Sequence, residues 1–340
     1  MDYAAVTPVA LAVEKEMQKI QNKFWANPSS LHKEGEEAKN VLAEARTKIA
    51  RILHCRANEI FFTSGGTESL NLAILGVIKD QIFGKPHIIV STIEHPAVLE
   101  PIKFLLKNKE AEVSFVSPNE KGIINPESIK KEIKENTVLV VVQHANNEIG
   151  AIQPIREVSK IKGGAYLLVD ACQSALYEDI SIERLGADIL VLDGIKMYGP
   201  RGVGILVVKH GTKISPITFG GGQENGLWPG TENVIGAAGL AKALEIAVQK
   251  REKESSRLLK LRDYAISKIL EIPPLHKSFA GQAISLNGSQ KNRLPNNINV
   301  CFSHFAEASR DESNKLDSEF LVITLDTLGF AVSSASACHT

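Results

Sequence analysis

The sequence lacks an excess of either charge and also lacks long apolar runs. Lysine plus arginine and aspartate plus glutamate each number 39 in the 340 residues, so the formal net charge is zero. No long-range field therefore favours nucleic acid or an anionic membrane. The longest apolar stretches, such as residues 137–142, have the length of a strand, whereas a membrane helix needs about 20 apolar residues. We therefore expect neither a nucleic-acid partner nor a membrane partner.

The N-terminus lacks an export signal. Residues 1–5 (Met-Asp-Tyr-Ala-Ala) contain no basic segment followed by an apolar one, and this absence predicts a cytoplasmic protein.

Cysteine is scarce, and its spacing excludes two kinds of structure. None of the four cysteines forms a CxxC pair, so we expect neither a protein-built metal site nor a disulfide framework. Cys55, Cys172 and Cys301 lie in or beside apolar segments, where each is expected to be a small buried side chain. Cys338 differs, because serine and alanine precede it and His339 follows it, a setting typical of an exposed loop.

Short apolar runs alternate with helix-length segments through most of the chain. Helical spacing of apolar residues predicts helices over Val9–Phe24, Gly35–Leu53, Glu68–Ile82 and Pro96–Lys107. Strands are predicted over Glu59–Thr63, His87–Ser91, Val113–Val116, Thr137–Gln143, Tyr166–Asp170, Ile189–Leu192 and Val203–Val208. This alternation predicts an α/β fold with a mostly parallel central sheet covered by helices on both faces.

The pattern changes after Gly230, where a long helix is predicted over Glu232–Leu270. Further on, we predict a strand over Pro295–Phe302, a polar loop over residues 304–314, a helix over Asp317–Leu328 and a strand over Gly329–Ser334. The predicted domains are an N-terminal segment of a small domain (1–15), a large domain (16–235), and a linking helix with a small α+β domain (236–340).

A glycine-containing turn lies between the first predicted strand and a helix. In Thr63-Ser64-Gly65-Gly66-Thr67-Glu68-Ser69, the helix N-terminus presents N–H groups that can bind a phosphate through Gly66 and Thr67. An ordinary strand-to-helix turn has the same composition. The run matches neither GxGxxG nor GxxxxGK[ST], which disfavours a dinucleotide site.

Two charged residues follow later strands. Asp170 ends one strand, where an acid faces the ligand crevice of an open α/β sheet, although a turn residue fits equally well. Lys196 follows the Ile189–Leu192 run, where a solvated lysine is commoner than a nucleophile. Together, a phosphate cradle, an acid and a lysine, each after its own strand, meet the needs of pyridoxal phosphate (PLP). The lysine forms a Schiff base and the acid pairs with the ring nitrogen.

Motifs along nearly the whole chain resemble the cysteine desulfurases of the class V aminotransferase group, which are fold-type-I PLP enzymes. The matching stretches are residues 2–8, 27–32, 62–69, 94–95, 146–150, 170–174, 220–224, 230–233 and 333–338. The resemblance implies conversion of L-cysteine to L-alanine with a persulfide left on the enzyme. It also implies a sulfur-acceptor or iron–sulfur scaffold protein as partner, in iron–sulfur cluster assembly or tRNA thiolation.

The same resemblance implies roles for individual residues beside Lys196 and Asp170. His95 would stack on the cofactor ring and assist proton transfer, although a histidine there can equally cap a helix. Asn147 would contact the cofactor or the substrate, and Gln173 would donate to the phenolic oxygen of the ring. Thr231 would reach the phosphate in a neighbouring subunit, which implies a homodimer, and Cys338 would attack the sulfur of the substrate.

The chain departs from the family pattern in three places. Asp193-Gly194-Ile195-Lys196 replaces the usual Ser-Gly-His-Lys, so a carboxylate takes the place of one phosphate donor and Ile195 donates nothing. Trp228 and Pro229 precede Gly230-Thr231 where an arginine is usual. The chain ends two residues after Cys338, before the family's substrate-clamping arginine, and we therefore expect a C-terminally truncated member. These departures predict weaker cofactor retention. They leave two alternatives open, a selenocysteine lyase-like enzyme or an impaired PLP-fold paralogue that acts as a binding or dimer partner.

Overall fold

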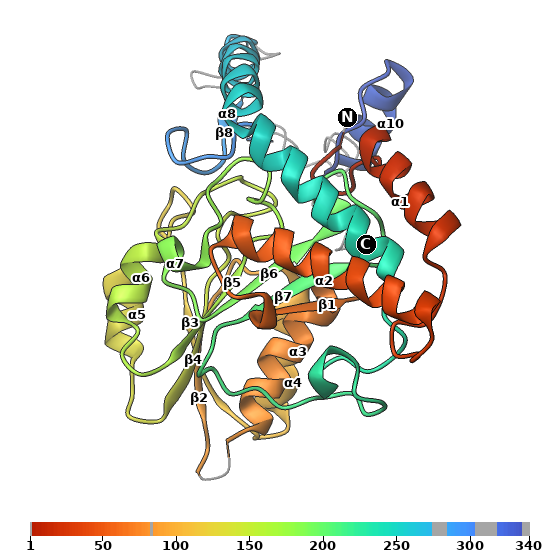
Figure 1. Ribbon diagram of the computed structural model, residues 1–340. Coiled ribbons are helices and arrows are strands. Elements are labelled where there is room, and N and C mark those ends of the chain that lie inside the picture. Colours follow the sequence, from red (N-terminus) through yellow and green to blue (C-terminus); the bar gives the residue numbers. More distant parts are fainter. Residues whose placement is uncertain (1, 82–83, 274–283, 303–317, 335–340) are drawn as a thin grey trace.

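A seven-stranded sheet forms the centre of the computed structural model, which describes residues 2–81, 84–273, 284–302 and 318–334 (Figure 1). The strand order is β1-β7-β6-β5-β4-β2-β3. The strands are β1 (Ile60–Thr63), β2 (His87–Ser91), β3 (Glu112–Val116), β4 (Thr137–Val141), β5 (Tyr166–Asp170), β6 (Ile189–Asp193) and β7 (Gly204–Val208). Every strand predicted in the first 208 residues is therefore present, with small shifts at the ends.

The sheet is mostly parallel, as predicted. Strands β3, β2, β4, β5 and β6 pair in parallel, whereas β7 is antiparallel to both β6 and β1. The exception has a simple cause, because a parallel crossover needs a dozen or more residues and usually a helix. The link from β6 to β7 contains only the short 3-10 helix η2 (Gly194–Lys196).

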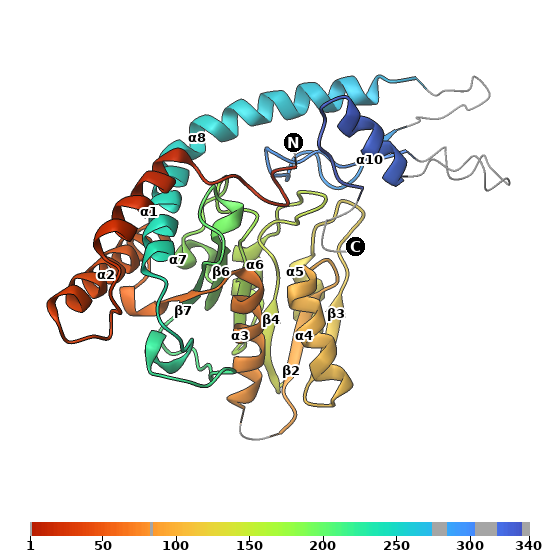
Figure 2. The ribbon, with the colours of Figure 1, turned by 90° about the vertical axis from the view of Figure 1, so that its right-hand side faces the viewer.

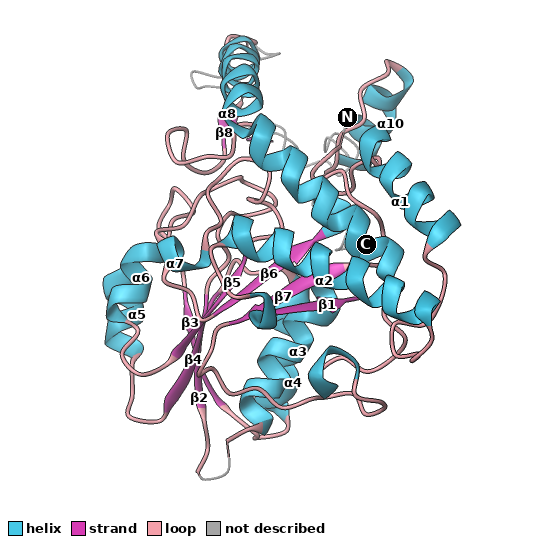
Figure 3. Ribbon diagram, in the orientation of Figure 1, coloured by secondary structure: helices cyan, strands magenta, loops and turns pink. Residues whose placement is uncertain are grey.

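Helices cover both faces of the sheet (Figure 3). Alternate strand residues point to opposite faces, so Val90 and Leu139 join a core with α3 (Gly66–Lys79) and α4 (Pro96–Lys107). Ile89 and Val140 join the core of the other face. That core includes residues of α1 (Leu11–Lys23), α2 (Lys33–Leu53), α5 (Pro126–Glu132), α6 (Ile155–Ile161), α7 (Ile182–Leu185) and α8 (Val234–Leu270).

Helix α8 joins the sheet to the last part of the chain (Figure 2). Its first half packs on α1 and α2 through Ala237, Leu240 and Leu244, while beyond Ala247 only Arg262 and Ile266 are buried. Among the helices that the structure describes, α8 included, none is both long and apolar enough to span a bilayer.

The C-terminal region contains an antiparallel pair, β8 (Ser285–Leu286) and β9 (Val300–Cys301), and the helix α10 (Ser318–Thr327). The strand predicted over Pro295–Phe302 is thus reduced to β9. The strand predicted over Gly329–Ser334 is wrong, because no neighbouring strand pairs with this segment and Phe330 and Val332 stay exposed. The polar loop predicted over residues 304–314 lies outside the described residues, and the domain boundaries stay a prediction.

Two short 3-10 helices complete the described elements. They are η1 (Ala57–Glu59), which leads into β1, and η3 (Gln223–Gly226), which precedes α8.

Candidate active site

Several loops meet at the carboxyl edge of the sheet, where open α/β folds bind their ligands. They follow β1, β2, β4, β5 and β6, which all run in the same direction. From β2 the chain moves outward to β3 and then returns to β4 on the other side of β2, so the loops after β2 and β4 diverge. The sequence-predicted residues His95, Asn147, Asp170, Gln173 and Lys196 all lie on these loops.

Lys196 and Gln173 meet at the N-terminal segment, which we define as residues 2–10. The Lys196 Nζ donates to the carbonyl oxygens of Ala5 at 2.8 Å and Ala4 at 3.0 Å. The Gln173 Nε2 donates to the same Ala4 oxygen at 3.0 Å. Two side chains from different strand ends are thus aimed at one point, although 23 positions separate them in the numbering.

The N-terminal segment is itself fastened to the loop that carries Lys196. Thr7 donates to the Ile195 carbonyl through its amide at 3.0 Å and through its hydroxyl at 2.8 Å. The Tyr198 amide donates to the Thr7 Oγ1 at 2.7 Å, and the Ala10 amide donates to the Tyr198 carbonyl. These bonds run along the whole η2 turn and hold the segment over the lysine.

Asp170 has the turn role that the sequence left open. It is the last residue of β5 and is 8% exposed, and its Oδ1 accepts the Cys172 N–H at 3.0 Å. The neighbouring Cys172 is half-buried, and desolvation of its thiol raises its pKa well above the ordinary value, with the carboxylates of Asp170 and Asp193 acting in the same direction. Cys172 therefore stays a thiol at neutral pH and is a poor nucleophile.

Asp193 reaches the N-terminus of α3 from the end of β6. Its Oδ2 accepts the Gly66 N–H at 2.9 Å, and its Oδ1 accepts the Ile195 N–H at 3.2 Å. Burial raises the pKa of Asp193 above its ordinary value, and the two N–H groups oppose that shift. A carboxylate thus occupies the turn that the sequence marks as a phosphate cradle.

Gly66 is required by this approach. A Cβ at that position would lie 3.1 Å from the Asp193 Oδ2 and 3.1 Å from the Cys172 Sγ, tighter than ordinary packing permits. Thr67, the next residue, is exposed in the first turn of α3.

His95 has the helix-capping role that the sequence left open. Its Nδ1 accepts the Ala97 N–H at 3.1 Å at the start of α4. Asn147 is half-buried in the loop after β4. Thr231 is exposed between η3 and α8, and Cys338 lies outside the described residues.

The sequence motifs also contain framework residues to which we assigned no role. Glu94 accepts hydrogen bonds from the Ser91 hydroxyl and from the Gln143 N–H at 2.9 Å, while its Oε2 is buried without a partner. Burial raises the pKa of Glu94 to about 8. Asn146 donates from Nδ2 to the Ile93 carbonyl at 3.0 Å and accepts the Ile149 N–H at 2.8 Å. Both residues join the loops after β2 and β4 across the point where they diverge.

The sequence feature that could have identified Glu94 and Asn146 is that each directly precedes a predicted site residue. Glu94-His95 and Asn146-Asn147 each place a buried polar residue before a more accessible one. The buried member holds the loop, and the accessible member is only half-buried.

A second loop, residues 287–297, holds the loop of Asn147 from outside. The Leu294 N–H donates to the Gly150 carbonyl at 2.9 Å, and the Ile152 N–H donates to the Asn292 carbonyl at 3.0 Å. The Asn297 Nδ2 donates to the Glu148 carbonyl at 2.7 Å.

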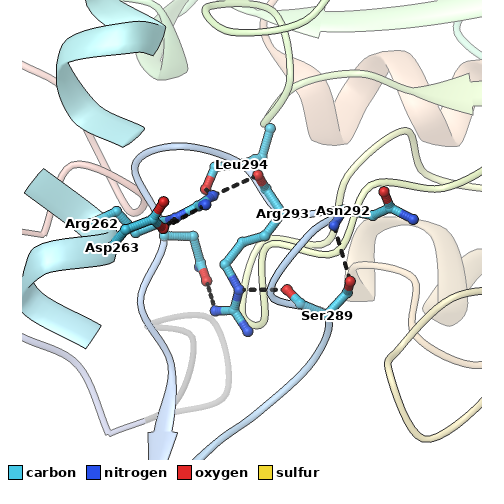
Figure 4. Close-up of polar contacts among 7 residues, drawn as sticks. Arg262, Asp263, Ser289, Asn292, Arg293 and Leu294 are labelled. Carbon is cyan, nitrogen blue, oxygen red and sulfur yellow. Dashed lines mark hydrogen bonds and ion pairs between the residues drawn. The ribbon is translucent and has the colours of Figure 1, made fainter. Parts of the chain in front are cut away.

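Two buried arginines keep this second loop in shape (Figure 4). The Arg293 side chain, 3% exposed, donates to the Ser289 carbonyl at 2.9 Å and to the Asn297 Oδ1 at 2.8 Å. Arg262 of α8 donates to the carbonyl of Arg293 at 2.9 Å, and its charge is paired with Asp263. Burial lowers the pKa of Arg293 to about 10. The C-terminal region thus supports one wall of the crevice.

Comparison with known proteins assigns this arrangement to a class. Residues 1–333 match the aminotransferase class-V family. The chain is 41% identical to the cysteine desulfurase IscS of Dictyoglomus turgidum, over 99% of this chain and 81% of that protein. It is also 41% identical to cysteine desulfurase IscS 1 of Archaeoglobus fulgidus, over 99% of this chain and 83% of that protein.

Solved structures give the same result. A NifS-like protein superimposes with a TM-score of 0.88 at 34% identity, over 98% of this chain and 86% of that one. SspA in complex with cysteine superimposes with a TM-score of 0.78 at 33% identity, over 99% of this chain and 95% of that one. The chain therefore belongs to the cysteine desulfurase family within the class-V aminotransferases.

The residues of the crevice fit PLP, the cofactor of this class. A lysine amine, an amide donor and a carboxylate at a strand end supply what the ring and aldehyde need. The helix N-terminus of α3 supplies N–H groups for a phosphate, and Gly66 keeps that position free of a side chain. The Asp193 carboxylate, bonded to the Gly66 N–H, conflicts with an anionic ligand there.

Proposed function

We propose that this chain is a PLP-dependent cysteine desulfurase that converts L-cysteine to L-alanine and leaves a persulfide on Cys338. The observation that carries the proposal is the meeting of Lys196 and Gln173 on the carbonyl of Ala4, beside the strand end that holds Asp170. In the balanced reaction, the carbon–sulfur bond of cysteine breaks and a sulfur–sulfur bond forms at the enzyme thiol. The enzyme thiol loses a proton when it forms the new bond, and the carbon that loses its sulfur takes up a proton to become the methyl group of alanine.

Each crevice residue has a part in this chemistry. When bound, PLP supplies an electron sink for the substrate's α-carbon. Lys196 would hold the cofactor covalently and move a proton. Its amine already has a fixed position, because it donates hydrogen bonds to two backbone carbonyls. Asp170 would keep a proton on the ring nitrogen, because a carboxylate stabilises an adjacent cation. Gln173 would donate to the ring oxygen, and His95 and Asn147 would orient the bound molecules.

The choice of Cys338 as sulfur acceptor agrees with the state of the other cysteines. Burial raises the pKa of Cys55 to about 12, and it also raises the pKa of Cys172 well above the ordinary value. Neither supplies a thiolate at neutral pH. Cys301 is exposed, so its predicted burial was wrong, because β9 belongs to a two-stranded pair rather than to a covered sheet.

The start of the Cys338 motif contacts the N-terminal segment. The Ser333 hydroxyl donates to the Asp2 Oδ2 at 2.5 Å, across 331 positions of sequence. The N-terminal segment therefore contacts both Lys196 and the first residue of the motif, and this supports a loop that delivers its thiol to the crevice.

We also propose a homodimer with sites completed across the interface by Thr231. Thr231 is exposed, and large apolar side chains at Trp25, Leu31 and Phe219 are 77%, 103% and 76% exposed. Exposed apolar side chains of this size are typical of surfaces that a partner covers. Light scattering of the cofactor-loaded protein should give a dimer, and a loaded monomer would contradict this assignment. A sulfur-acceptor protein and a cytoplasmic location complete the proposal.

The test is a single incubation of the purified protein with PLP and L-cysteine. We expect alanine in solution and, after alkylation, a persulfide that mass spectrometry maps to the Cys338 peptide. The Cys301→Ser variant should behave as the parent does, and Cys338→Ser should form no persulfide. Persulfide on Cys172 or Cys301, with Cys338 unmodified, would overturn the mechanism.

The Asp193 carboxylate favours one second candidate, a PLP-fold protein that has lost catalysis and acts as a binding or dimer partner. The absorbance spectrum separates the two, because only the enzyme should develop a visible cofactor band that L-cysteine alters. A substrate series with selenocysteine in the same assay identifies a lyase-like preference.

A further inference from the structure

The start of α3 is capped by a carboxylate from a distant strand. The N-cap residue, Gly65, has no side chain to accept the first N–H groups of the helix. Asp193, 127 positions away, takes this role, with 2.9 Å between its Oδ2 and the Gly66 nitrogen. An anion at this helix end is favoured by the macrodipole and by the unpaired N–H groups. The helix terminus thus already carries the kind of charge that a phosphate would bring.

The Gly66 N–H already has an acceptor, because its nitrogen lies 2.9 Å from the Asp193 Oδ2. The same carboxylate oxygen lies 3.1 Å from the Cβ position of Gly66, so it occupies the space beside this residue. A phosphate oxygen that bound the Gly66 N–H would take the place of the Asp193 oxygen or lie directly against it.

The charges around Asp193 make this conflict electrostatic. Lys196 on η2 is the cation that faces it, and Asp170 at the end of β5 is an anion acting on it. Glu68 of α3 brings a further carboxylate, whose Oε2 lies 3.1 Å from the Cβ position of Gly65, and the Cys172 thiol is neutral. Two like charges at hydrogen-bond distance repel each other more strongly inside a protein than in water, because the effective dielectric is lower there. An ionised Asp193 therefore opposes a phosphate dianion, whereas a protonated one can donate a hydrogen bond to it.

Building on the proposed function, we propose that Asp193 is an internal competitor for the cofactor's phosphate and takes up a proton when the phosphate binds. Two consequences follow from this assignment. The preference for PLP over pyridoxal, which has no phosphate, should be low in the parent protein and should increase when the charge is removed. The preference should also weaken as the pH rises, by up to about tenfold per pH unit for one linked proton.

The experiment measures the dissociation constants of PLP and pyridoxal by absorbance titration, between pH 7 and 9. The phosphate is a dianion throughout this range, since its second pKa is about 6. The ratio of the two constants isolates the phosphate, because both ligands react with the same lysine. We expect the ratio to favour PLP at least about tenfold more in Asp193→Asn than in the parent, with a flat pH profile in the variant.

Two further variants separate the effect of the Asp193 charge from other effects of substitution. Asp193→Ser removes the charge by a different side chain and should give the same change as Asp193→Asn. Asp188→Asn is the matched control, because Asp188 also accepts a backbone N–H, that of Leu167 at 2.8 Å, but lies before β6 at the opposite edge of the sheet. Its ratio should equal that of the parent.

The outcomes separate this inference from the proposed function. If the ratio is the same in the parent and both Asp193 variants, the competitor assignment is wrong and the enzyme proposal stands. A parent ratio that does not change with pH would remove the proton linkage. If neither ligand binds to any variant, the proposed function fails, and the inference fails with it.

Discussion

The two ends of the crevice are built in different ways. At the lysine end, the Lys196 amine and the Gln173 amide converge on backbone carbonyls of the N-terminal segment, and Asp170 closes the strand beside them. At the α3 end, the cradle is closed by the chain's own carboxylate, Asp193. The lysine end has the polar groups that a PLP ring needs. The α3 end has a negatively charged carboxylate where a phosphate donor is usual. The comparison indicates that ring chemistry and phosphate binding can be altered separately in this chain.

The largest effect is expected from Lys196→Ala, which removes the amine of the lysine end. This variant should show no visible cofactor band and no borohydride trapping, because Lys196 is the lysine that bonds to the Ala4 carbonyl in the part of the chain that the structure describes. Lys79→Ala, which removes an exposed lysine bonded to the Pro216 carbonyl, is the control and should trap the cofactor normally. Trapping that maps to a different lysine would contradict the assignment.

Asp170→Asn should decrease turnover by about 100-fold or more while part of the cofactor remains bound. Asparagine can still accept the Cys172 N–H and so keep the turn, but it removes the negative charge beside the ring nitrogen. Steady-state alanine production measures the loss. The control is Asp179→Asn, where the carboxylate also accepts a backbone N–H, that of Ser181. Unchanged alanine production in Asp170→Asn would refute the electronic role.

The strand that leads to the α3 end depends on a buried ion pair. Arg46 forms two bonds to Glu224, at 2.6 and 2.9 Å, and the Glu224 Oε2 accepts the Phe62 N–H at the edge of the sheet. Arg46→Ala leaves the Glu224 carboxylate buried without its cation, so the free energy of unfolding should fall by about 3–5 kcal/mol. Urea denaturation measures this loss.

The matched control for that variant is the exposed pair of Lys268 and Glu271, whose nitrogen and oxygen are 2.7 Å apart. Lys268→Ala should cost at most about 1 kcal/mol, because water screens the pair. Equal losses in the two variants would show that burial of Glu224 does not matter.

The smallest effect, taken over one pH unit, is a change in how stability depends on pH. Glu94 has a pKa of about 8 in the folded chain and an ordinary value of 4.5, so between these values the folded state holds a proton that the unfolded state has lost. Stability should therefore decrease as the pH rises through this window, by up to about 1.4 kcal/mol per unit. Glu94→Gln, which keeps an acceptor for Ser91, should flatten the profile in urea melts. Glu110→Gln, at an exposed glutamate, should leave the profile as it is.

The sequence by itself determined the sheet and most of the candidate residues. Buried strands are continuous apolar runs bounded by helix signals, and such local patterns place β1 to β7 and α1 to α4 within a few residues. Ligand residues of open α/β folds follow strands directly, and this rule singled out Gly66, Asp170 and Lys196. The same local reasoning failed at Cys301 and at residues 329–334, because β-prone residues become buried strands only where a partner strand and a covering layer exist.

Only the tertiary structure decided which of these residues meet. The bonds from Lys196 to Ala4 and Ala5 span 192 and 191 positions, the bond from Gly66 to Asp193 spans 127, and that from Ser333 to Asp2 spans 331. Neither partner of such a pair has a local pattern that names the other. Each contact depends on how helices and strands pack, so a carboxylate seen in the sequence as a lost phosphate donor becomes, in the fold, the cap of α3.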